Sequence, residues 1–184
     1  RIFCEYRDQR SFPLLLPLLD QPCPVERMSV VYALGRNPCP SAVQKLVSLL
    51  ESDDNAYVRR ATAWSLANYD NQIVLKPLIN ALKNDVAAVR LWSSSSLAEI
   101  GNVSSKNAEL AAEQLLISLK IDNESGVRSN CIWSLCRLFE KLDNTFQECF
   151  VDECTKIALF DKEPSVMEEA KTALDSMGMQ GFYN

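Results

Sequence analysis

The segment VRRATAWSLA at residues 58–67 recurs along the chain in altered copies, and this repetition decides the fold. Related segments are VRLWSSSSLA at residues 89–98 and VRSNCIWSLC at residues 127–136. Each copy has an arginine, called here the anchor, in its second position. A small residue follows the anchor by six positions and a leucine follows it by seven. A shared spacing of this kind is typical of repeat proteins.

Five copies of the pattern cover most of the sequence. The anchors are Arg27, Arg59, Arg90 and Arg128, with Met167 in the last copy, and their successive spacings are 32, 31, 38 and 39 residues. The leucines are Leu34, Leu66, Leu97, Leu135 and Leu174, and the small residues are Ala33, Ser65, Ser96, Ser134 and Ala173. A small residue at a fixed position allows neighbouring helices to approach closely.

Each repeat predicts two helices joined by a polar turn. The first helix is rich in leucine, as in VQKLVSLL at residues 43–50, and the turn ESDDN follows at residues 51–55. The second helix carries the anchor, and apolar or small residues recur along one of its faces. These predicted buried stripes are Val58, Thr62, Leu66 and Tyr69, then Val89, Ser93, Leu97 and Ile100, and then Val127, Cys131, Leu135 and Leu138.

Helix pairs of this kind leave an apolar face that only a neighbouring pair covers, so stacked pairs form an α-solenoid with a concave side. We predict an all-α, right-handed superhelix of about five two-helix repeats, forming one domain over residues 1–178. The expected repeats span residues 12–37, 42–70, 74–101, 109–140 and 149–178, with a tail at 179–184. Extra residues at 102–106 and 141–147 predict longer loops or helix extensions. Residues 1–10 resemble the remnant of a preceding repeat, and Gly178 is a predicted helix stop.

Composition excludes several functional classes. Among 184 residues there is no histidine, which excludes histidine-based triads and histidine metal sites. Only 5 glycines are present, which disfavours glycine-rich phosphate loops. The net charge of −5 gives no support to nucleic acid as a partner. No apolar run reaches the roughly 20 residues of a membrane span, so we expect no membrane insertion.

The seven cysteines give no strong signal for a metal or a disulfide framework. They are Cys4, Cys23, Cys39, Cys131, Cys136, Cys149 and Cys154. None forms a CxxC motif, and we expect mostly reduced thiols in a cytoplasmic protein. One cysteine of the 131/136 pair can meet one of the 149/154 pair across two helices, but two thiolates are incomplete as a cluster site. We favour core or incidental cysteines, with Cys23 and Cys39 exposed in turns.

The repeated pattern resembles HEAT repeats, and more narrowly the HEAT-like repeats of the phycobilisome-lyase type. The resemblance rests on residues 58–67 and on the VR…LAEIG pattern of residues 89–101, and it extends over about residues 12–178. It implies an α-solenoid that serves as a bilin lyase subunit, a phycobilisome turnover factor or a plain scaffold. If it holds at the lyase level, it implies a cyanobacterial cytosol or a plastid stroma. An iron-dependent hydroxylase of this fold uses His-Glu ligand pairs, which this chain lacks.

The anchor arginines and the acidic turns form the first set of candidate residues. An arginine at the start of one helix can bridge to an aspartate in a neighbouring turn. The resemblance implies that such pairs form a structural ladder between repeats; a stripe that binds anions is the alternative. The candidate ladder residues are Asp20, Arg27, Asp53 (or its neighbour Asp54), Arg59, Asp85, Arg90, Asp122 and Arg128.

A row of aromatic residues forms the second set. The fifth position after the anchor holds Tyr32, Trp64, Ser95, Trp133 and Thr172, about 160° around the helix from the buried leucine. Trp92 lies on the same face three residues before Ser95, so the row includes all three tryptophans. The predicted partner-binding residues are Tyr32, Arg36, Trp64, Asn68, Trp92, Glu99, Trp133 and Arg137.

Two interpretations of this row stay open. Flat rings beside hydrogen-bonding groups suit a peptide, a partner helix or a planar ligand. Alternatively, the rings fill the seam between adjacent second helices. Trp64 and Asn68 also resemble the Trp-xxx-Asn pair of armadillo repeats in importin-α-like proteins, but only this repeat matches.

No serine, cysteine or carboxylate has a recognisable base beside it, so no catalytic residue is assigned, and we expect no cofactor and no metal. The sequence therefore favours a protein–protein interaction scaffold or assembly factor. A bilin lyase or chaperone subunit is the alternative, with a phycobiliprotein or a second HEAT-like chain as partner. A non-catalytic subunit of a larger photosynthetic or biosynthetic assembly is a third possibility.

Overall fold

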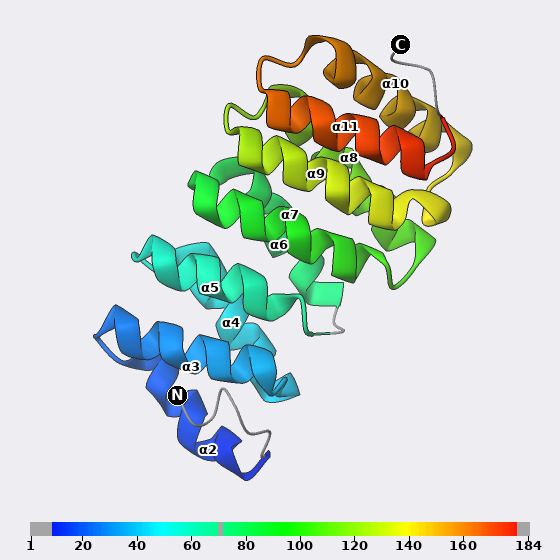
Figure 1. Ribbon diagram of the computed structural model, residues 1–184. Coiled ribbons are helices and arrows are strands. Elements are labelled where there is room, and N and C mark those ends of the chain that lie inside the picture. Colours follow the sequence, from blue (N-terminus) through cyan, green and yellow to red (C-terminus); the bar gives the residue numbers. More distant parts are fainter. Residues whose placement is uncertain (1–8, 70–71, 180–184) are drawn as a thin grey trace. The chain divides into compact units, whose positions relative to one another are not determined.

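The computed structural model describes residues 9–69 and 72–179, and regular structure in these residues is helical throughout (Figure 1). The α-helices are α2 (Phe12–Leu15), α3 (Pro24–Arg36), α4 (Val43–Ser52), α5 (Ala56–Leu66), α6 (Leu75–Asn84), α7 (Ala87–Gly101), α8 (Ser105–Ile121), α9 (Ser125–Leu138), α10 (Asn144–Phe160) and α11 (Pro164–Ser176). Short 3-10 helices are η1 (Gln9–Ser11), η2 (Leu16–Asp20), η3 (Pro40–Ala42), η4 (Gln72–Val74) and η5 (Phe139–Lys141). The predicted all-α repeat fold is confirmed.

The chain divides into two compact units, Arg1–Ile100 and Gly101–Asn184, called here unit 1 and unit 2. In unit 1, α5 packs against α3 and α4, and α4 also contacts α6. In unit 2, α8 pairs with α9, α10 pairs with α11, and α9 packs along α11. The single repeat domain over residues 1–178 stays a prediction.

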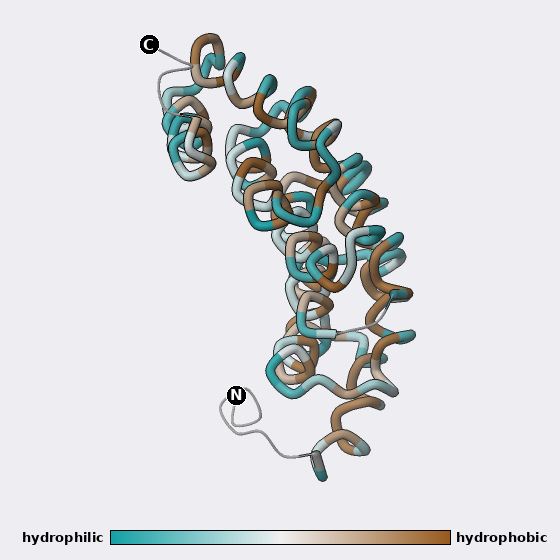
Figure 2. The backbone as a smooth tube through the Cα atoms, turned by 90° about the vertical axis from the view of Figure 1, so that its right-hand side faces the viewer, coloured by the Kyte–Doolittle hydropathy of each residue, from teal (hydrophilic) through white to brown (hydrophobic). Residues whose placement is uncertain are grey.

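The predicted stripes on the second helices are the cores of the repeats. Every residue of the three stripes is buried, from Val58 at 0% exposure to Tyr69 at 4%. All five repeat leucines are fully covered as well. Figure 2 shows hydrophobic and hydrophilic residues alternating within the helices, as expected for amphipathic helices whose apolar side is packed.

Local sequence signals fix several helix ends. The side chains of Asn55, Ser104 and Asp143 accept hydrogen bonds from backbone N–H groups in the first turns of α5, α8 and α10. Gly178 has a φ of +76°, just beyond the end of α11, and the N–H of Met179 donates to the carbonyl of Leu174. Gly178 therefore acts as the predicted helix stop.

The extra residues in the last two repeats lengthen helices. α8 and α10 each have 17 residues, whereas α4 and α6 each have 10. α8 begins at Ser105 and α10 at Asn144, four and five residues before the predicted starts of those repeats. Both outcomes predicted for these insertions occur: residues 105–106 and 144–147 extend helices, whereas residues 102–104 and 142–143 lie in the connections.

Small residues bring the second helices of unit 1 together. Ser96 on α7 donates a hydrogen bond of 2.7 Å to the carbonyl of Ala63 on α5. Gly35 on α3 lies so close to α5 that an added Cβ would be 3.1 Å from Ser65 Cα. Ser93 and Ser94 are fully buried too, so the serine run of residues 93–96 serves close packing.

Cys39 corrects one expectation, because it is buried rather than exposed. Only 4% of its surface is accessible, and its backbone N–H donates to Tyr69 Oη at 3.3 Å. The same Tyr69 hydroxyl donates to the carbonyl of Leu34 at 3.0 Å. Tyr69 at the end of the second repeat is therefore hydrogen-bonded to the end of α3 and to the turn between α3 and α4, and Cys39 in this turn is buried. Cys23 is exposed, as predicted, and Cys4 lies outside the described residues.

Within the described ranges, no helix combines the length and the apolar character needed to cross a bilayer.

Candidate functional site

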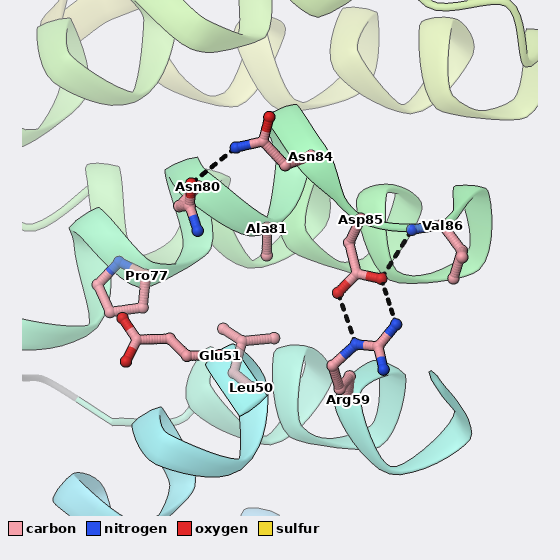
Figure 3. A pocket seen from close by; sticks show the side chains of 9 residues that line it. All are labelled: Leu50, Glu51, Arg59, Pro77, Asn80, Ala81, Asn84, Asp85 and Val86. Atoms are coloured by element: carbon pink, nitrogen blue, oxygen red, sulfur yellow. Dashed lines mark hydrogen bonds and ion pairs between the residues drawn. The ribbon is translucent and has the colours of Figure 1, made fainter. Parts of the chain in front are cut away.

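Three arginine anchors form two-pronged ion pairs with an aspartate of the following repeat. Arg27 meets Asp53 through two contacts of 2.8 Å, and Arg59 meets Asp85 at 2.7 and 2.8 Å (Figure 3). Arg128 meets Asp161 at 2.8 and 3.1 Å. Paired N–H groups facing both carboxylate oxygens are a strong and directional arrangement.

The remaining guanidinium nitrogen secures the arginine's own turn. Nη1 of Arg59 donates to the carbonyl of Asp53 at 2.7 Å, and Nη1 of Arg90 donates to the carbonyl of Asp85 at 2.8 Å. Nη1 of Arg128 donates to the carbonyls of Asp122 and Asn123. Each guanidinium of an ion pair therefore satisfies a turn in its own repeat and a carboxylate in the next.

Two ladder aspartates differ from the sequence-based expectation. Asp161, which the sequence analysis missed, is the partner of Arg128. Asp20 pairs with Lys45 instead of an anchor, and both side chains are well exposed, at 66% and 40%. A search for an aspartate two to four residues before each second helix finds Asp161 even though the last repeat has Met167 as its anchor.

These contacts change the acidity of the carboxyl groups. Burial alone raises the pKa of Asp53, Asp85 and Asp161, but hydrogen bonds from the paired arginine and from a backbone N–H outweigh it, so each pKa lies below its usual value. Hydrogen bonds to Asp53 and Asp85 in turn raise the pKa of Arg27 and Arg59. A carboxyl group whose pKa is lowered by folding stabilises the fold at pH values above its ordinary pKa of about 4. This contribution is lost as the pH falls through the lowered pKa.

In unit 1, the aromatic residues divide into a packed pair and an exposed ring. The rings of Tyr32 and Trp64 lie 5.3 Å apart across the seam of α3 and α5, and the Arg36 guanidinium lies 5.9 Å from the Trp64 ring. Trp92 on α7 is instead 36% exposed. Seam packing therefore describes Tyr32 and Trp64, whereas Trp92 faces solvent.

In unit 2, the aromatic position is open. Trp133 on α9 is 40% exposed, and the Arg137 guanidinium lies over its ring at 5.1 Å. This geometry is a cation–π contact that holds a flat ring and a donor group side by side.

The flanking polar residues of the predicted surface, Arg36, Asn68, Glu99 and Arg137, are all exposed. The amide of Asn68, which lies just beyond the end of α5, donates to the carbonyl of Ser65 in that helix at 3.4 Å. The surface predicted from sequence therefore consists of one part on unit 1 and one part on unit 2.

The family profile for HEAT repeats matches residues 1–67 and 43–136, which together exceed half of the chain. The chain belongs to the HEAT-repeat family. No curated protein matches it.

Several solved structures resemble this HEAT-repeat chain at low sequence identity. One is from the complex of CpcE and CpcF of phycocyanin lyase from Nostoc sp. PCC7120, with a TM-score of 0.72 and 21% identity, covering 90% of this chain and 99% of that chain. An engineered protein has a TM-score of 0.63 and 22% identity, covering 89% and 79%. A computationally designed armadillo repeat protein for modular peptide recognition has a TM-score of 0.59 and 17% identity, covering 95% and 89%. These likenesses support the fold.

The cysteines of this HEAT-repeat chain offer no obvious ligand set. Burial raises the pKa of Cys136 to about 11 and also raises the pKa of Cys154, whose shift includes a contribution from Cys136. These two thiols are one of the cross-helix combinations that the 131/136 and 149/154 pairs allow, and at neutral pH both stay protonated. Among the described residues, no group of three or more His, Cys, Asp or Glu side chains is placed to hold a metal ion.

A pocket of about 350 Å³ lies between α4 and α6, and we call it the α4–α6 notch (Figure 3). Its lining is largely polar: the Arg59–Asp85 pair lies along one side, and Asn84 donates to Asn80 at 2.7 Å. The Arg59–Asp85 pair of the ladder therefore forms part of the wall of this notch.

Proposed function

We propose that this HEAT-repeat protein is a protein–protein interaction scaffold whose second helices bind a partner protein or peptide. The observation that carries the proposal is the exposure of Trp92 and Trp133 on α7 and α9, beyond what packing of the repeats needs. Large rings with an adjacent arginine are the side chains that most often dominate binding energy at protein interfaces. The proposed partner is a phycobiliprotein or a second HEAT-like chain.

Substitution of Trp92 and Trp133 by serine tests this role. Tagged wild type and the double variant are purified from the native cells, and co-purifying proteins are quantified by mass spectrometry. We expect recovery of the main partner to fall at least about tenfold, because the binding rings are lost while the buried stripes are untouched. Trp64 is left in place, since its ring packs against Tyr32.

The control variant is Tyr57→Ser, which removes a ring that is 65% exposed elsewhere on unit 1. It should recover the partner as well as wild type does. Equal recovery by the Trp92/Trp133 variant, with unchanged circular dichroism, would rule out the aromatic surface. A stoichiometric complex that survives the double variant would instead favour a subunit held in a larger assembly.

A bilin lyase or chaperone subunit is the second candidate function. It is supported by the likeness to the CpcE and CpcF complex, which covers 90% of this chain. Titration of the purified protein with phycocyanobilin separates the two proposals. A chain that handles bilin should shift and intensify the visible absorption of the pigment, and an unchanged spectrum, alone and with candidate partner chains, would argue against this role.

A further inference from the structure

The first helices of unit 2 carry exposed apolar residues where α4 and α6 of unit 1 carry polar ones. The position directly before the turn aspartate is Ser52 in α4 and Asn84 in α6. In unit 2 the same position is Ile121, which is 72% exposed, and Phe160, which is 80% exposed. Since α4 and α6 fold with polar side chains there, and Ile121 and Phe160 are exposed, packing does not explain these two apolar side chains.

Both residues line a pocket of about 420 Å³ between α8 and α10, which we call the α8–α10 notch. It is the counterpart of the α4–α6 notch, and the Arg128–Asp161 pair replaces Arg59–Asp85. Six lining positions differ between the notches. Counted from the turn aspartate, Phe160 replaces Asn84, Ile157 replaces Ala81, Lys156 replaces Asn80, Lys120 replaces Glu51, Glu153 replaces Pro77 and Lys162 replaces Val86.

The outward charge of the α8–α10 notch is positive, although the whole chain has a net charge of −5. Lys156 is 68% exposed and Lys120 is 42% exposed, and Lys162 is exposed at the rim. The carboxylate of Glu153, which both Lys120 and Lys156 approach at 3.6 to 3.8 Å, is only 15% exposed. Asp161 is covered and paired with Arg128, and Asp122, the third carboxylate of the lining, is half-buried. Four cationic side chains therefore outnumber three carboxylates along the notch. A ligand therefore meets apolar side chains bordered by lysines.

We propose that the α8–α10 notch docks an acidic amphipathic segment of a partner protein. A large apolar side chain of this segment packs against Ile121 and Phe160, and its carboxylates face Lys156 and Lys162. A second copy of this chain is a poorer occupant, because a two-fold contact through the notch places lysines against lysines. The site lies on first helices, so it does not depend on the proposed role of Trp92 and Trp133.

Peptide selection on the full-length protein tests the proposal. A displayed library of random 16-residue peptides is selected on wild type and depleted on the Phe160→Asn/Lys156→Asn variant. This variant introduces the asparagines that the α4–α6 notch has at the equivalent positions, Asn84 and Asn80. We expect the retained peptides to combine Asp or Glu with large apolar residues. Their Kd, measured by fluorescence anisotropy, should rise at least about tenfold in the variant and also rise with added salt.

The Tyr57→Ser variant is the matched control and should bind the selected peptides within about twofold of wild type. Phe160 and Lys156 are highly exposed, so the variant should keep the helicity and unfolding midpoint of wild type. Three results would overturn the proposal: no peptide distinguishes wild type from the variant, the retained peptides lack acidic residues, or sedimentation shows a wild-type dimer that the variant abolishes.

Discussion

Replacement of Asp161 by alanine is expected to lower the free energy of unfolding by about 3 kcal/mol. Asp161 and Arg128 are among the most enclosed ion-paired side chains, with 9% and 6% of their surfaces exposed. The substitution leaves the Arg128 cation in place with only backbone carbonyls as partners. Urea unfolding of wild type and variant at pH 7, followed by circular dichroism, measures the loss.

Asp20→Ala is the control for this prediction, because Asp20 belongs to the same set of turn aspartates but forms an exposed pair with Lys45. We expect a change within about 0.5 kcal/mol. Asp161→Asn should approach wild type in stability as pH falls through the lowered pKa of Asp161, since protonation removes the charge that the variant lacks. Equal effects of Asp161→Ala and Asp20→Ala would contradict a stabilising role for the buried pair.

Gly35→Ala is expected to destabilise unit 1 by about 1–2 kcal/mol, although alanine is the better helix former by about 1 kcal/mol. The added Cβ would lie 2.6 Å from Cζ3 of Trp64 and 3.0 Å from Oγ of Ser65. The Trp64 contact is with the edge of a side chain, which can rotate, but the nearby Cα of Ser65 is helix backbone and moves only with α5. Thermal unfolding followed by circular dichroism measures the change.

A second substitution separates the two clashes. Gly35→Ala combined with Trp64→Leu removes the ring contact but keeps the close approach to the backbone of α5. If the double variant is still less stable than Trp64→Leu alone, the separation of α3 and α5 sets the requirement for glycine. A Gly35→Ala protein as stable as wild type, or more stable, would show that helix propensity outweighs this contact.

Periodicity made most of the architecture predictable. The stripe from Val58 to Tyr69 and its two counterparts are buried because a helix that repeats every 3.6 residues must bury the face that carries its apolar side chains. The pattern also located the arginines of the ladder. It did not show which aspartate each arginine binds. An arginine is close in sequence to the aspartate of its own turn, and it reaches the aspartate of the following repeat only in the folded stack.

The misses have local physical causes. Cys39 stands between two prolines, which indicates an exposed turn, but Tyr69 from 30 residues away binds its N–H and covers it. Asp161 was missed because the candidate aspartates were those in turns before an anchor arginine, and its repeat has Met167 in the anchor position. The exposed Phe160 and Ile121 look in sequence like ordinary apolar residues at a helix end, and only their surroundings distinguish them from core.

The lengths of the first helices have a consequence for how such proteins vary. α8 and α10 exceed α4 and α6 by seven residues, and seven residues rotate a helix to within about 20° of two complete turns. The chain therefore enters the longer helix on nearly the same side, about 10 Å farther along its axis. An insertion of five residues would turn the entry point by about 140° and misdirect the preceding connection. Growth of a repeat by near-heptad steps thus preserves the stacking geometry while widening the face offered to other molecules.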